Sequence, residues 1–497
     1  MKTIIALTVS LLIVNSTMRA EKQADRHPLD KSESRKLILD NGLKVYLLSD
    51  PDFNVSAASL SVEVGSLEDP DNREGLAHFL EHMAFKGTAR MGARELEETV
   101  AGIVDEVRVR GDRALIELTR KFDRAKLTAG SLFVSEEEFA EAEAAVRPST
   151  KRAIRASRRN IHAFAKESMR KDWKRKNAEG AVVGERFVPF DRVGIYVPGG
   201  KAPLVSTALM TGAFAQAARV PEIVAATPVG PTGRVNAELL YALRQAGATE
   251  VLKVGGAQAV AALALGTKSV GRVDKIFGPG NAFVVEAKRQ LVGAVSIDLL
   301  PGPSEVLVVS DTSGDPVCIA ADLLAQAEHG GDSVAGFVTN SSRLLKRVEK
   351  EIDRQLQLLS RSNYIEESLK KGGFALLVPS MDEAVRICNV FAPEHLSLVV
   401  RDERRRLAQI KTAGAIYLGN ASAIAVGDFL AGPSHTLPTG GAGKSFSGLR
   451  ADQFQRRTSI VKMDIASVKK SLPVVQEFAR IEGLDAHGES VRLRVER

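Results

Sequence analysis

Between about residues 190 and 310, short apolar runs alternate with stretches of helical spacing. Runs typical of buried strands occur at residues 193–197, 222–226, 250–254, 275–277 and 306–309. Helical stretches such as residues 237–246 and 257–265 lie between them. This βαβ rhythm is typical of parallel sheets covered by helices. It predicts an α/β fold whose ligands bind beyond the carboxyl ends of strands, where glycine-rich turns let the backbone approach phosphate.

A second constraint is a set of side chains suited to binding one metal ion. Gln326 and His329 stand three residues apart in a run of helical spacing, residues 320–329, so both are predicted to leave the same helix face. Asp428 and His487 add a carboxylate oxygen and an imidazole nitrogen. Two imidazoles, one carboxylate and one amide oxygen suit Zn²⁺ better than Mg²⁺ or Ca²⁺, and they leave room for substrate atoms.

Several segments that follow one another in order carry a family resemblance. They are Gly194-Ile-Tyr-Val-Pro-Gly-Gly200, Gly255-Gly-Ala-Gln-Ala259, Ile276-Phe-Gly-Pro-Gly-Asn281, Gly302-Pro-Ser-Glu-Val306, Gln326-Ala-Glu-His-Gly330, Pro393-Glu-His-Leu396 and Glu482-Gly-Leu-Asp-Ala-His487. With these segments, residues 91–497 resemble the histidinol dehydrogenases, zinc- and NAD-dependent enzymes of the last two oxidations in histidine biosynthesis. The resemblance covers roughly four-fifths of the chain.

The resemblance implies incomplete Rossmann-like parallel-sheet domains with helical and C-terminal dimerisation segments. It also implies that NAD is contacted by Tyr196, Gln258 and Asn281. These residues are an aromatic face and two amides near glycine-rich turns, which suit ribose and pyrophosphate. No G-x-G-x-x-G fingerprint accompanies them.

The resemblance assigns the catalytic roles to Glu394 and His395. His395 is the base that takes the hydroxyl proton while hydride leaves to NAD⁺, a task that suits a side chain with a pKa near neutrality. Glu394 is the base that activates water for the second oxidation. Pro393 precedes the pair and restricts the local backbone.

The substrate contacts implied by the resemblance draw on both the metal-binding and the catalytic residues. They are Ser304, Gln326, His329, His395, Asp428, His435, Glu482 and His487. The metal ligands among them are Gln326, His329, Asp428 and His487, which would hold one Zn²⁺ per subunit. The resemblance also places Glu482 and His487 of one chain in the active site of another, so it implies a homodimer with shared sites.

The first ninety residues differ from the rest. Residues 1–20 have a lysine at position 2, an apolar run and Ala20, which together resemble a secretory signal peptide. Residues 36–48 hold two apolar runs around Asn41-Gly42, which predicts a β-hairpin, and residues 55–64 alternate like a third strand.

A helix predicted to begin near Gly75 carries His78-Phe-Leu-Glu-His82, an H-x-x-E-H arrangement. With its surroundings, it makes residues 21–90 similar to the opening of the pitrilysin/insulinase family of zinc peptidases. That family needs a further glutamate ligand from a later helix and a second half-molecule, and the chain is already dehydrogenase-like there. The predicted organisation is therefore a signal-like segment, a peptidase-like fragment whose H-x-x-E-H site is inert, and a dehydrogenase-like region.

Composition bears on partners and compartment. The net charge of +7 comes mainly from residues 151–176, where apolar residues recur at helical spacing, so the basic residues are predicted to form the solvated face of an amphipathic helix rather than a nucleic-acid site. No segment after residue 20 is long and apolar enough to span a membrane. Only Cys318 and Cys388 occur, so a reducing compartment is predicted. NAD and the histidine pathway that the resemblance implies favour the cytoplasm, against the signal-like start.

Three classes of function compete: an NAD-linked dehydrogenase, a zinc peptidase, and a binding protein that retains an inactive scaffold. The complete set of site residues favours the dehydrogenase. The substrate could still be another amino or hydroxy alcohol. One departure from the family is Pro301, which stands where alanine is usual and could alter the backbone near Ser304.

Overall fold

The computed structural model describes residues 33–38, 44–49, 92–199, 203–330 and 332–496. The chain divides into two compact units, Met1–Lys86 and Gly87–Arg497. In the first unit, β1 (Glu33–Ile38) pairs antiparallel with β2 (Lys44–Ser49), which confirms the predicted hairpin. The expected third strand and the H-x-x-E-H helix with His78 and His82 lie outside the described residues.

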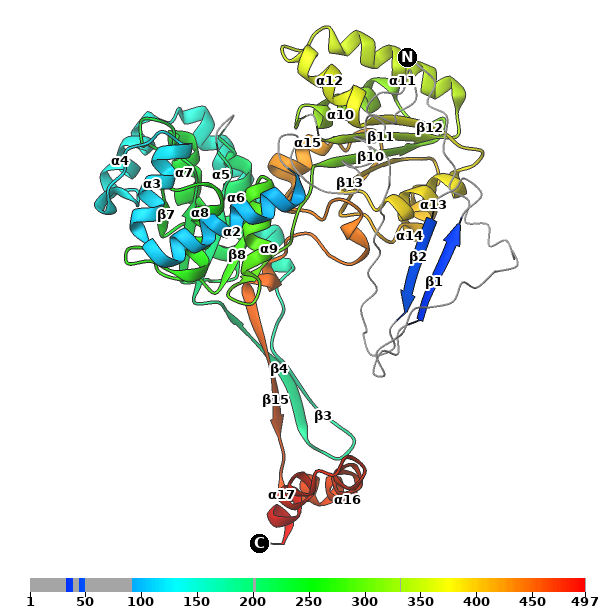
Figure 1. The fold of residues 1–497 in the computed structure, drawn as a ribbon. Coiled ribbons are helices and arrows are strands. Elements are labelled where there is room, and N and C mark those ends of the chain that lie inside the picture. Colours follow the sequence, from blue (N-terminus) through cyan, green and yellow to red (C-terminus); the bar gives the residue numbers. More distant parts are fainter. Residues whose placement is uncertain (1–32, 39–43, 50–91, 200–202, 331, 497) are drawn as a thin grey trace. The chain divides into compact units, whose positions relative to one another are not determined.

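The second unit contains two parallel five-stranded sheets (Figure 1). The first has the order β7-β6-β5-β8-β9, so the chain enters at the central strand, adds strands to one side and then crosses to the other. Its strands are β5 (Arg192–Tyr196), β6 (Glu222–Ala226), β7 (Glu250–Leu252), β8 (Lys275–Phe277) and β9 (Ser296–Ile297). The predicted strands of this region are thereby confirmed.

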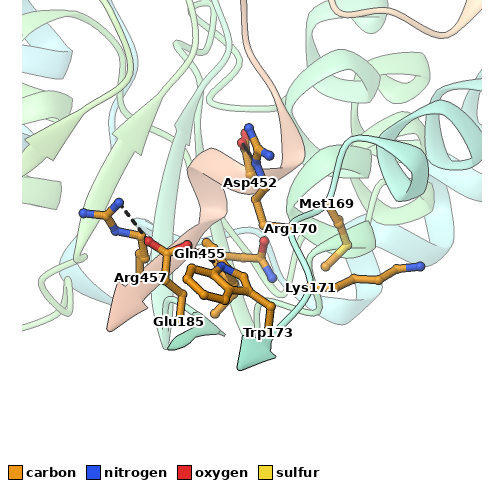
Figure 2. A pocket seen from close by; sticks show the side chains of 9 residues that line it. Met169, Arg170, Lys171, Trp173, Glu185, Asp452, Gln455 and Arg457 are labelled. Atoms are coloured by element: carbon orange, nitrogen blue, oxygen red, sulfur yellow. Dashed lines mark hydrogen bonds and ion pairs between the residues drawn. The ribbon is translucent and has the colours of Figure 1, made fainter. Parts of the chain in front are cut away.

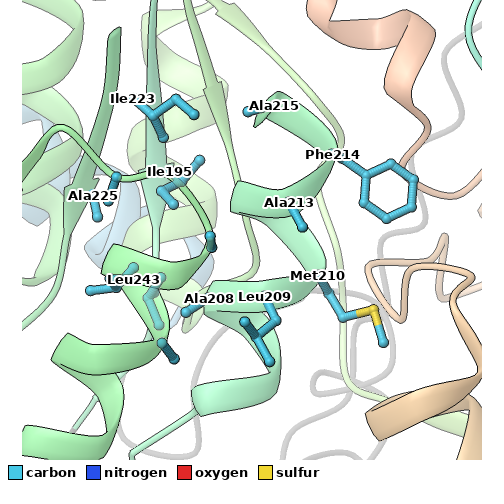
Figure 3. Close-up of a cluster of buried hydrophobic side chains, with 14 of the residues drawn as sticks. Ile195, Ala208, Leu209, Met210, Ala213, Phe214, Ala215, Ile223, Ala225 and Leu243 are labelled. Atoms are coloured by element: carbon cyan, nitrogen blue, oxygen red, sulfur yellow. The ribbon is translucent and has the colours of Figure 1, made fainter. Parts of the chain in front are cut away.

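The helices between these strands cover both faces of the first sheet. They are α6 (Val205–Ala217), α7 (Ala237–Gln245), α8 (Gly256–Leu265) and α9 (Ala282–Leu291). On one face, Met210 and Phe214 of α6 are fully buried in the same core as Ile195 and Ile223 of the sheet (Figure 3). Burying a side chain of this size contributes about 1.5–3 kcal/mol, so α6 is held by its packing.

Helices before the first sheet complete its cover. This part of the chain begins with α2 (Ala93–Arg110) and α3 (Asp112–Phe122), which Gly111 separates with a φ of 53°. Val100 of α2 shares a core with Val260 of α8 on the second face. The segment continues through η2 (Ala129–Ser131), α4 (Glu136–Ala145) and α5 (Pro148–Glu167).

The predicted amphipathic helix over residues 151–176 is too long. α5 ends at Glu167, and the basic residues after Trp173 lie on a strand, β3 (Trp173–Lys176). Pairing explains the difference: β3 joins β4 (Val182–Pro189) and β15 (Gln455–Lys462) in an antiparallel sheet, and Trp173 Nε1 donates to Glu185 Oε2 (2.8 Å). Cross-strand partners distant in sequence thus override the local periodicity.

The second parallel sheet repeats the pattern of the first, with the order β12-β11-β10-β13-β14. Its strands are β10 (Glu305–Ser310), β11 (Val334–Thr339), β12 (Gly373–Leu377), β13 (His395–Val399) and β14 (Ala415–Leu418). Its helices are α10 (Pro316–Ala327), α11 (Ser342–Leu356), α12 (Ser362–Gly372), α13 (Met381–Phe391) and α14 (Glu403–Gln409). The predicted Rossmann-like α/β class is confirmed.

After β14 the chain forms α15 (Ile424–Val426), a π-helical turn η3 (Gly427–Ala431), and the short helices η4 (Ala442–Lys444) and η5 (Ala451–Phe454). It ends in two helices packed on each other, α16 (Ile465–Glu482) and α17 (Asp485–Val495). Large apolar side chains remain exposed on this pair: Val474, Phe478, Ile481, Leu484 and Leu493. Among the described residues, no helix is long and apolar enough to cross a membrane.

Candidate active site

Glu394 and His395 lie at the amino-terminal edge of the second sheet. His395 is the first residue of β13 and stands opposite Val306, the second residue of β10. Glu394 Oε2 accepts hydrogen bonds from Ser304 Oγ (2.6 Å) and Glu305 N (2.8 Å), both at the start of β10. The predicted pair is therefore fixed by the neighbouring strand and is buried.

The same edge receives the end of α10. Because α10 follows β10 and runs back across the sheet, its last turn lies near the strand beginnings. Gln326 is in that turn and is buried, while His329 stands just beyond the C-cap residue Glu328. His329 N still donates to Gln326 O (3.1 Å), so the two residues stay on one continuous turn. The predicted helix over residues 320–329 ends two residues early, but the two predicted ligands remain together.

Asp428 reaches the cluster from the π-helical turn η3. Single π-helical turns often occur at functional sites because the extra residue moves a side chain out of the regular helical register. Gly427 permits this turn, since a Cβ there would lie 2.1 Å from Tyr417 Oη. Helix α5 supports the turn: Ser157 Oγ donates to Phe429 O (2.5 Å) and Asn160 Nδ2 donates to Leu430 O (3.1 Å).

Burial changes the acidity of Glu394. It raises the pKa of this carboxyl to about 7, while His395, Ser304 and the Glu305 amide act in the opposite direction. A carboxyl group with a pKa near neutrality can exchange a proton at physiological pH, which is what a general base requires.

The surroundings of His395 determine which ring nitrogen is reactive. Nδ1 lies 3.1 Å from the Glu305 carbonyl oxygen, which can only accept, so Nδ1 carries a proton. Nε2 faces Asp428 Oδ1 at 3.4 Å. Burial lowers the pKa of His395, but Asp428 and Glu394 outweigh this effect and leave it raised. Burial likewise opposes ionisation of Asp428, yet His395 and the other histidines leave the pKa of Asp428 lowered.

His435 connects this cluster to the first sheet. Its Nδ1 lies 3.2 Å from the Asp428 carbonyl oxygen, so Nδ1 donates, and Nε2 accepts from Thr207 Oγ1 at 3.3 Å. Thr207 belongs to α6, which follows the carboxyl end of β5. Burial lowers the pKa of His435, consistent with a neutral ring.

Several donor atoms in the cluster fit a metal ion. Gln326 Nε2 and Asp428 Oδ1 are buried and make no hydrogen bond within the described part of the chain. An amide can be turned to present its oxygen instead, so Gln326, His329 and Asp428 offer a mixed nitrogen and oxygen set suited to Zn²⁺. Within the same described ranges, no three His, Cys, Asp or Glu side chains are grouped to hold a metal.

Glu482 and His487 are not brought to this cluster within one chain. Glu482 ends α16 and His487 lies on α17, and both are exposed. None of the hydrogen bonds or ion pairs found among the described residues joins either side chain to Glu394, His395 or Asp428.

The three predicted nucleotide contacts gather at the carboxyl edge of the first sheet. Tyr196 ends β5, Gln258 is in the first turn of α8, and Asn281 caps α9, where its Oδ1 accepts from Val284 N (3.2 Å). Tyr196 Oη accepts from Gly256 N (3.0 Å), and burial raises the pKa of Tyr196 to about 12. β5 and β8 flank the point where the strand order reverses, which is where open α/β sheets bind nucleotides.

A surface recess of about 670 Å³ lies elsewhere, beside the antiparallel sheet (Figure 2). Trp173, Glu185 and Arg457 line it, and Arg457 pairs with Glu185 at 3.1 Å. Its lining residues include none of the cluster around Glu394 and His395.

Known proteins similar to this chain identify the family to which this arrangement belongs. The family model described as histidinol dehydrogenase matches residues 87–495. The histidinol dehydrogenase of a Synechococcus strain is 44% identical over 398 residues, covering 80% of this chain and 92% of that protein. The chain belongs to the histidinol dehydrogenase family.

Two further relatives agree with this assignment. The Geobacter sulfurreducens histidinol dehydrogenase is 42% identical and covers 81% of this chain and 94% of its own. The crystal structure of the Elizabethkingia anophelis histidinol dehydrogenase aligns with a TM-score of 0.79 at 35% identity, over 81% of this chain and 92% of that one. This histidinol dehydrogenase family member is therefore an enzyme of the oxidoreductase class, associated with histidine biosynthesis.

A second family model matches the N-terminal region that resembles zinc peptidases. The insulinase (peptidase family M16) model matches residues 44–127, which overlaps the first residues of the dehydrogenase match. In the overlap, α2 and α3 pack onto α8 and α9 of the first sheet, so those helices are part of the dehydrogenase fold.

Some contributors to the site were not identified from the sequence. The main chain of Glu305 donates to Glu394 and accepts from His395, and a backbone role leaves no side-chain pattern. Tyr417 lies beside His395, with ring centroids 6.0 Å apart. Near Pro301, the Ser304 carbonyl oxygen accepts from Val334 N (3.0 Å) as β10 begins, so this backbone joins the sheet.

Proposed function

We propose that this enzyme oxidises L-histidinol to L-histidine through L-histidinal, using two NAD⁺ for each histidine formed and holding one Zn²⁺ per subunit. The observation that carries the proposal is the buried Glu394–His395 pair, with His395 Nε2 at 3.4 Å from Asp428. The link from Asp428 through His435 to Thr207 brings this pair toward the edge of the first sheet that carries Tyr196. These contacts support a common reaction region for the proposed base and the proposed nucleotide site.

Gln326, His329 and Asp428 would hold the metal, with His487 of a second chain as the fourth ligand. Bound Zn²⁺ would fix the amine and imidazole nitrogens of the substrate and so position its carbinol carbon. Ser304, His435 and Glu482 of the second chain would complete the substrate contacts, with Glu482 pairing with a cationic group.

His395 serves the first oxidation. Its Nδ1 proton is held by the Glu305 carbonyl, so Nε2 is the nitrogen available to accept the hydroxyl proton of the alcohol. Bound NAD⁺ would supply the hydride acceptor, so that removal of this proton by His395 and loss of the hydride from the carbinol carbon would give the aldehyde.

Glu394 serves the second oxidation. The aldehyde must add water before it can lose another hydride, and Glu394 takes the proton from that water. Its raised pKa near 7 makes the carboxylate a stronger base than an exposed glutamate. Ser304 and the Glu305 amide orient the carboxylate through their hydrogen bonds to Oε2.

The test is NADH production by the purified chain with L-histidinol. We expect two NADH for each histidine formed, loss of activity on chelation, and recovery with Zn²⁺. One NADH per turnover would contradict the two-step scheme. A panel of other amino and hydroxy alcohols distinguishes a different substrate from an inactive scaffold, which would reduce NAD⁺ with none of them.

We propose that two copies form a homodimer with shared sites. The exposed Val474, Phe478 and Ile481 of α16 present an apolar surface beside Glu482, as expected of a region covered by another chain. Two variants test this, H487A and E394Q, because a mixed dimer has one complete site and one doubly defective site. After co-refolding with random exchange, overall conversion should recover to about a quarter of wild type by two-fold symmetry counting.

Differentially tagged chains and light scattering provide the control for that experiment. They establish that dimers form and exchange. Absence of recovery under those conditions would mean either that each chain closes its own site or that the N-terminal segment disrupts the shared interface.

We propose that the H-x-x-E-H segment performs no chemistry. Its match to the peptidase family ends at residue 127, where the chain already follows the dehydrogenase fold. The double variant H78A/H82A should keep full dehydrogenase activity, and the wild type should cleave no peptide in a mixed panel. Metal-dependent cleavage that the double variant loses would refute this.

A further inference from the structure

Lys288 and Asp298 form an ion pair beneath the nucleotide edge of the first sheet. The Lys288 Nζ atom lies 2.6 Å from Asp298 Oδ1, and both side chains are fully buried. Lys288 is in the last turn of α9, and Asp298 directly follows β9. The mechanism proposed above uses neither residue.

The pair is bonded to the backbone of a glycine turn. Lys288 Nζ donates to the Gly278 carbonyl oxygen (2.6 Å), and Gly278 N donates to Asp298 Oδ2 (2.7 Å). Both polar groups of the Gly278 backbone are therefore held by one ion pair. Gly278 follows β8 and begins the Gly-Pro-Gly-Asn segment that ends at Asn281.

This turn needs external support because its conformation is unusual. Gly278 has a φ of +106°, and a Cβ at this residue would lie 2.2 Å from the Tyr196 carbonyl oxygen. The turn thus packs directly on the end of β5, between Tyr196 and Asn281. A small displacement of Gly278 would change how both residues face a ligand.

Asp298 also holds the chain that leaves the first sheet. Its Oδ1 accepts from Leu299 N (2.7 Å), and the five residues from Leu299 to Pro303 lead to Ser304 beside Glu394. Buried ion pairs add little net stability compared with apolar residues of similar size, because desolvation offsets their attraction. The value of this pair therefore lies in the backbone geometry that it fixes.

We propose that Lys288 and Asp298 are positioning residues that hold the Gly278 turn in the conformation required to bind the dinucleotide. The inference rests on the proposed NAD-dependent function. It assigns the pair an effect on nucleotide affinity that exceeds its effect on folding.

The experiment measures the Kd of NAD⁺ for the metal-loaded dimer by calorimetry, with thermal unfolding and circular dichroism as folding checks. The first variant is K288M, which keeps the length of the side chain and removes its charge. The second is K288M/D298N, which leaves no unpaired buried charge and so remains informative if the first variant fails to fold. We expect the Kd of NAD⁺ to rise about tenfold in both, since hydrogen bonds from a displaced turn lose strength steeply with angle and distance.

The matched control is K253M. Lys253 is also a buried lysine of the first half, and its Nζ lies 3.1 Å from both carboxylate oxygens of Glu138. That pair ties the end of β7 to α4 and is not hydrogen-bonded to Gly278. K253M should lower the thermal stability and leave the Kd of NAD⁺ unchanged, and K288R should restore part of the affinity lost in K288M.

The possible results distinguish a failure of the role assigned to Lys288 and Asp298 from a failure of the proposed function. Folded K288M/D298N that binds NAD⁺ as the wild type does overturns the inference and leaves the proposed function intact. An equal loss of affinity in K253M also overturns it, because the effect is then one of general stability. A wild type that neither binds NAD⁺ nor reduces it with L-histidinol refutes the proposed function itself.

Discussion

The two parallel sheets share one strand order, but the predicted site residues lie at opposite edges of the two sheets. The first sheet places Tyr196 and Asn281 at its carboxyl edge, beside the reversal of strand order. The second sheet places Glu394 and His395 at its amino edge, where β13 begins. The shared topology therefore did not determine at which edge of a sheet the predicted site residues lie.

The opposite edge of each sheet, which carries no predicted site residue, is held by ion pairs or hydrogen bonds of its own side chains. At the amino edge of the first sheet, Arg192 pairs with Glu222 and with Glu250 at 2.6 Å, at the starts of three adjacent strands. At the carboxyl edge of the second sheet, Asp311 accepts from Ser313 N (2.8 Å) and from Arg401 N (3.0 Å) across the reversal of strand order. At this edge one carboxylate therefore links the backbone segments that follow β10 and β13.

The largest effect should come from His395 at the amino edge of the second sheet. Replacing it by asparagine, H395N, keeps a donor for the Glu305 carbonyl and removes the base. We expect kcat for alcohol oxidation to fall by about 10²–10⁴-fold, the usual contribution of a general base, with an unchanged Kd for NAD⁺. The control is H162N, because His162 of α5 lies outside the cluster. If H395N weakened NAD⁺ binding as much as turnover, the assignment of proton transfer to one edge and of NAD⁺ binding to the other would be wrong.

Replacement of Glu394 should slow the second oxidation much more than the first. E394Q retains the shape of the side chain and removes its basicity, so oxidation of the aldehyde should fall by about 10²-fold while oxidation of the alcohol falls much less. Single-turnover kinetics started from histidinol and from histidinal measure the two steps separately. S304A is the companion variant, since it removes one hydrogen bond to Glu394 and leaves the carboxylate in place. Equal losses in both steps for E394Q would contradict the assigned roles.

The pH dependence of the second step should follow Glu394. Because burial raises the pKa of Glu394 to about 7, the carboxylate is protonated as the pH falls through that value and can no longer act as a base. Between pH 8 and pH 6 we expect the rate of aldehyde oxidation to fall about tenfold. The pH profile of E394Q should lack this transition. A wild-type profile that is flat between these values would exclude Glu394 as the titrating base.

The smallest effect should come from Tyr196 at the carboxyl edge of the first sheet. Y196F removes the acceptor of the Gly256 amide, a hydrogen bond worth about 1 kcal/mol, so NAD⁺ binding should weaken about fivefold with kcat unchanged. Y241F is the matched control, because Tyr241 Oη accepts from Arg155 Nε (3.0 Å) in the same half without touching the predicted nucleotide residues. A loss of kcat in Y196F would show that the carboxyl edge also takes part in the chemistry.

Much of the fold could be predicted because it is encoded locally. The strands around Tyr196 and Phe277 are short apolar runs between glycine-rich turns, and the structure has them within a few residues. Trp173 was placed on a helix because its strand partner Glu185 could not be recognised from spacing. Tertiary pairing decided the conformation of that segment.

The site was predictable only where side chains carry the chemistry. Gln326, Asp428 and His395 were predicted as site residues from residue type and family resemblance, and the structure has Asp428 and His395 within 3.4 Å of each other. The Glu305 backbone contacts and the Lys288–Asp298 pair were not, since a buried lysine in an amphipathic helix has the same pattern as a solvated one. The places of Glu482 and His487 depend on a second chain and remain predictions.

The hydrogen bonds from α5 to the π-helical turn have a consequence for how this enzyme can be divided. Ser157 and Asn160 belong to α5 in the half that contains the first sheet, yet they donate hydrogen bonds to the turn that carries Asp428 in the other half. A fragment that ends after the first sheet would lack Asp428. A fragment that begins after the first sheet would contain Asp428 but would lack the hydrogen bonds from α5 that support its turn. The predicted site thus depends on hydrogen bonds between the two halves, and cutting the gene at their boundary would leave neither fragment with a supported Asp428.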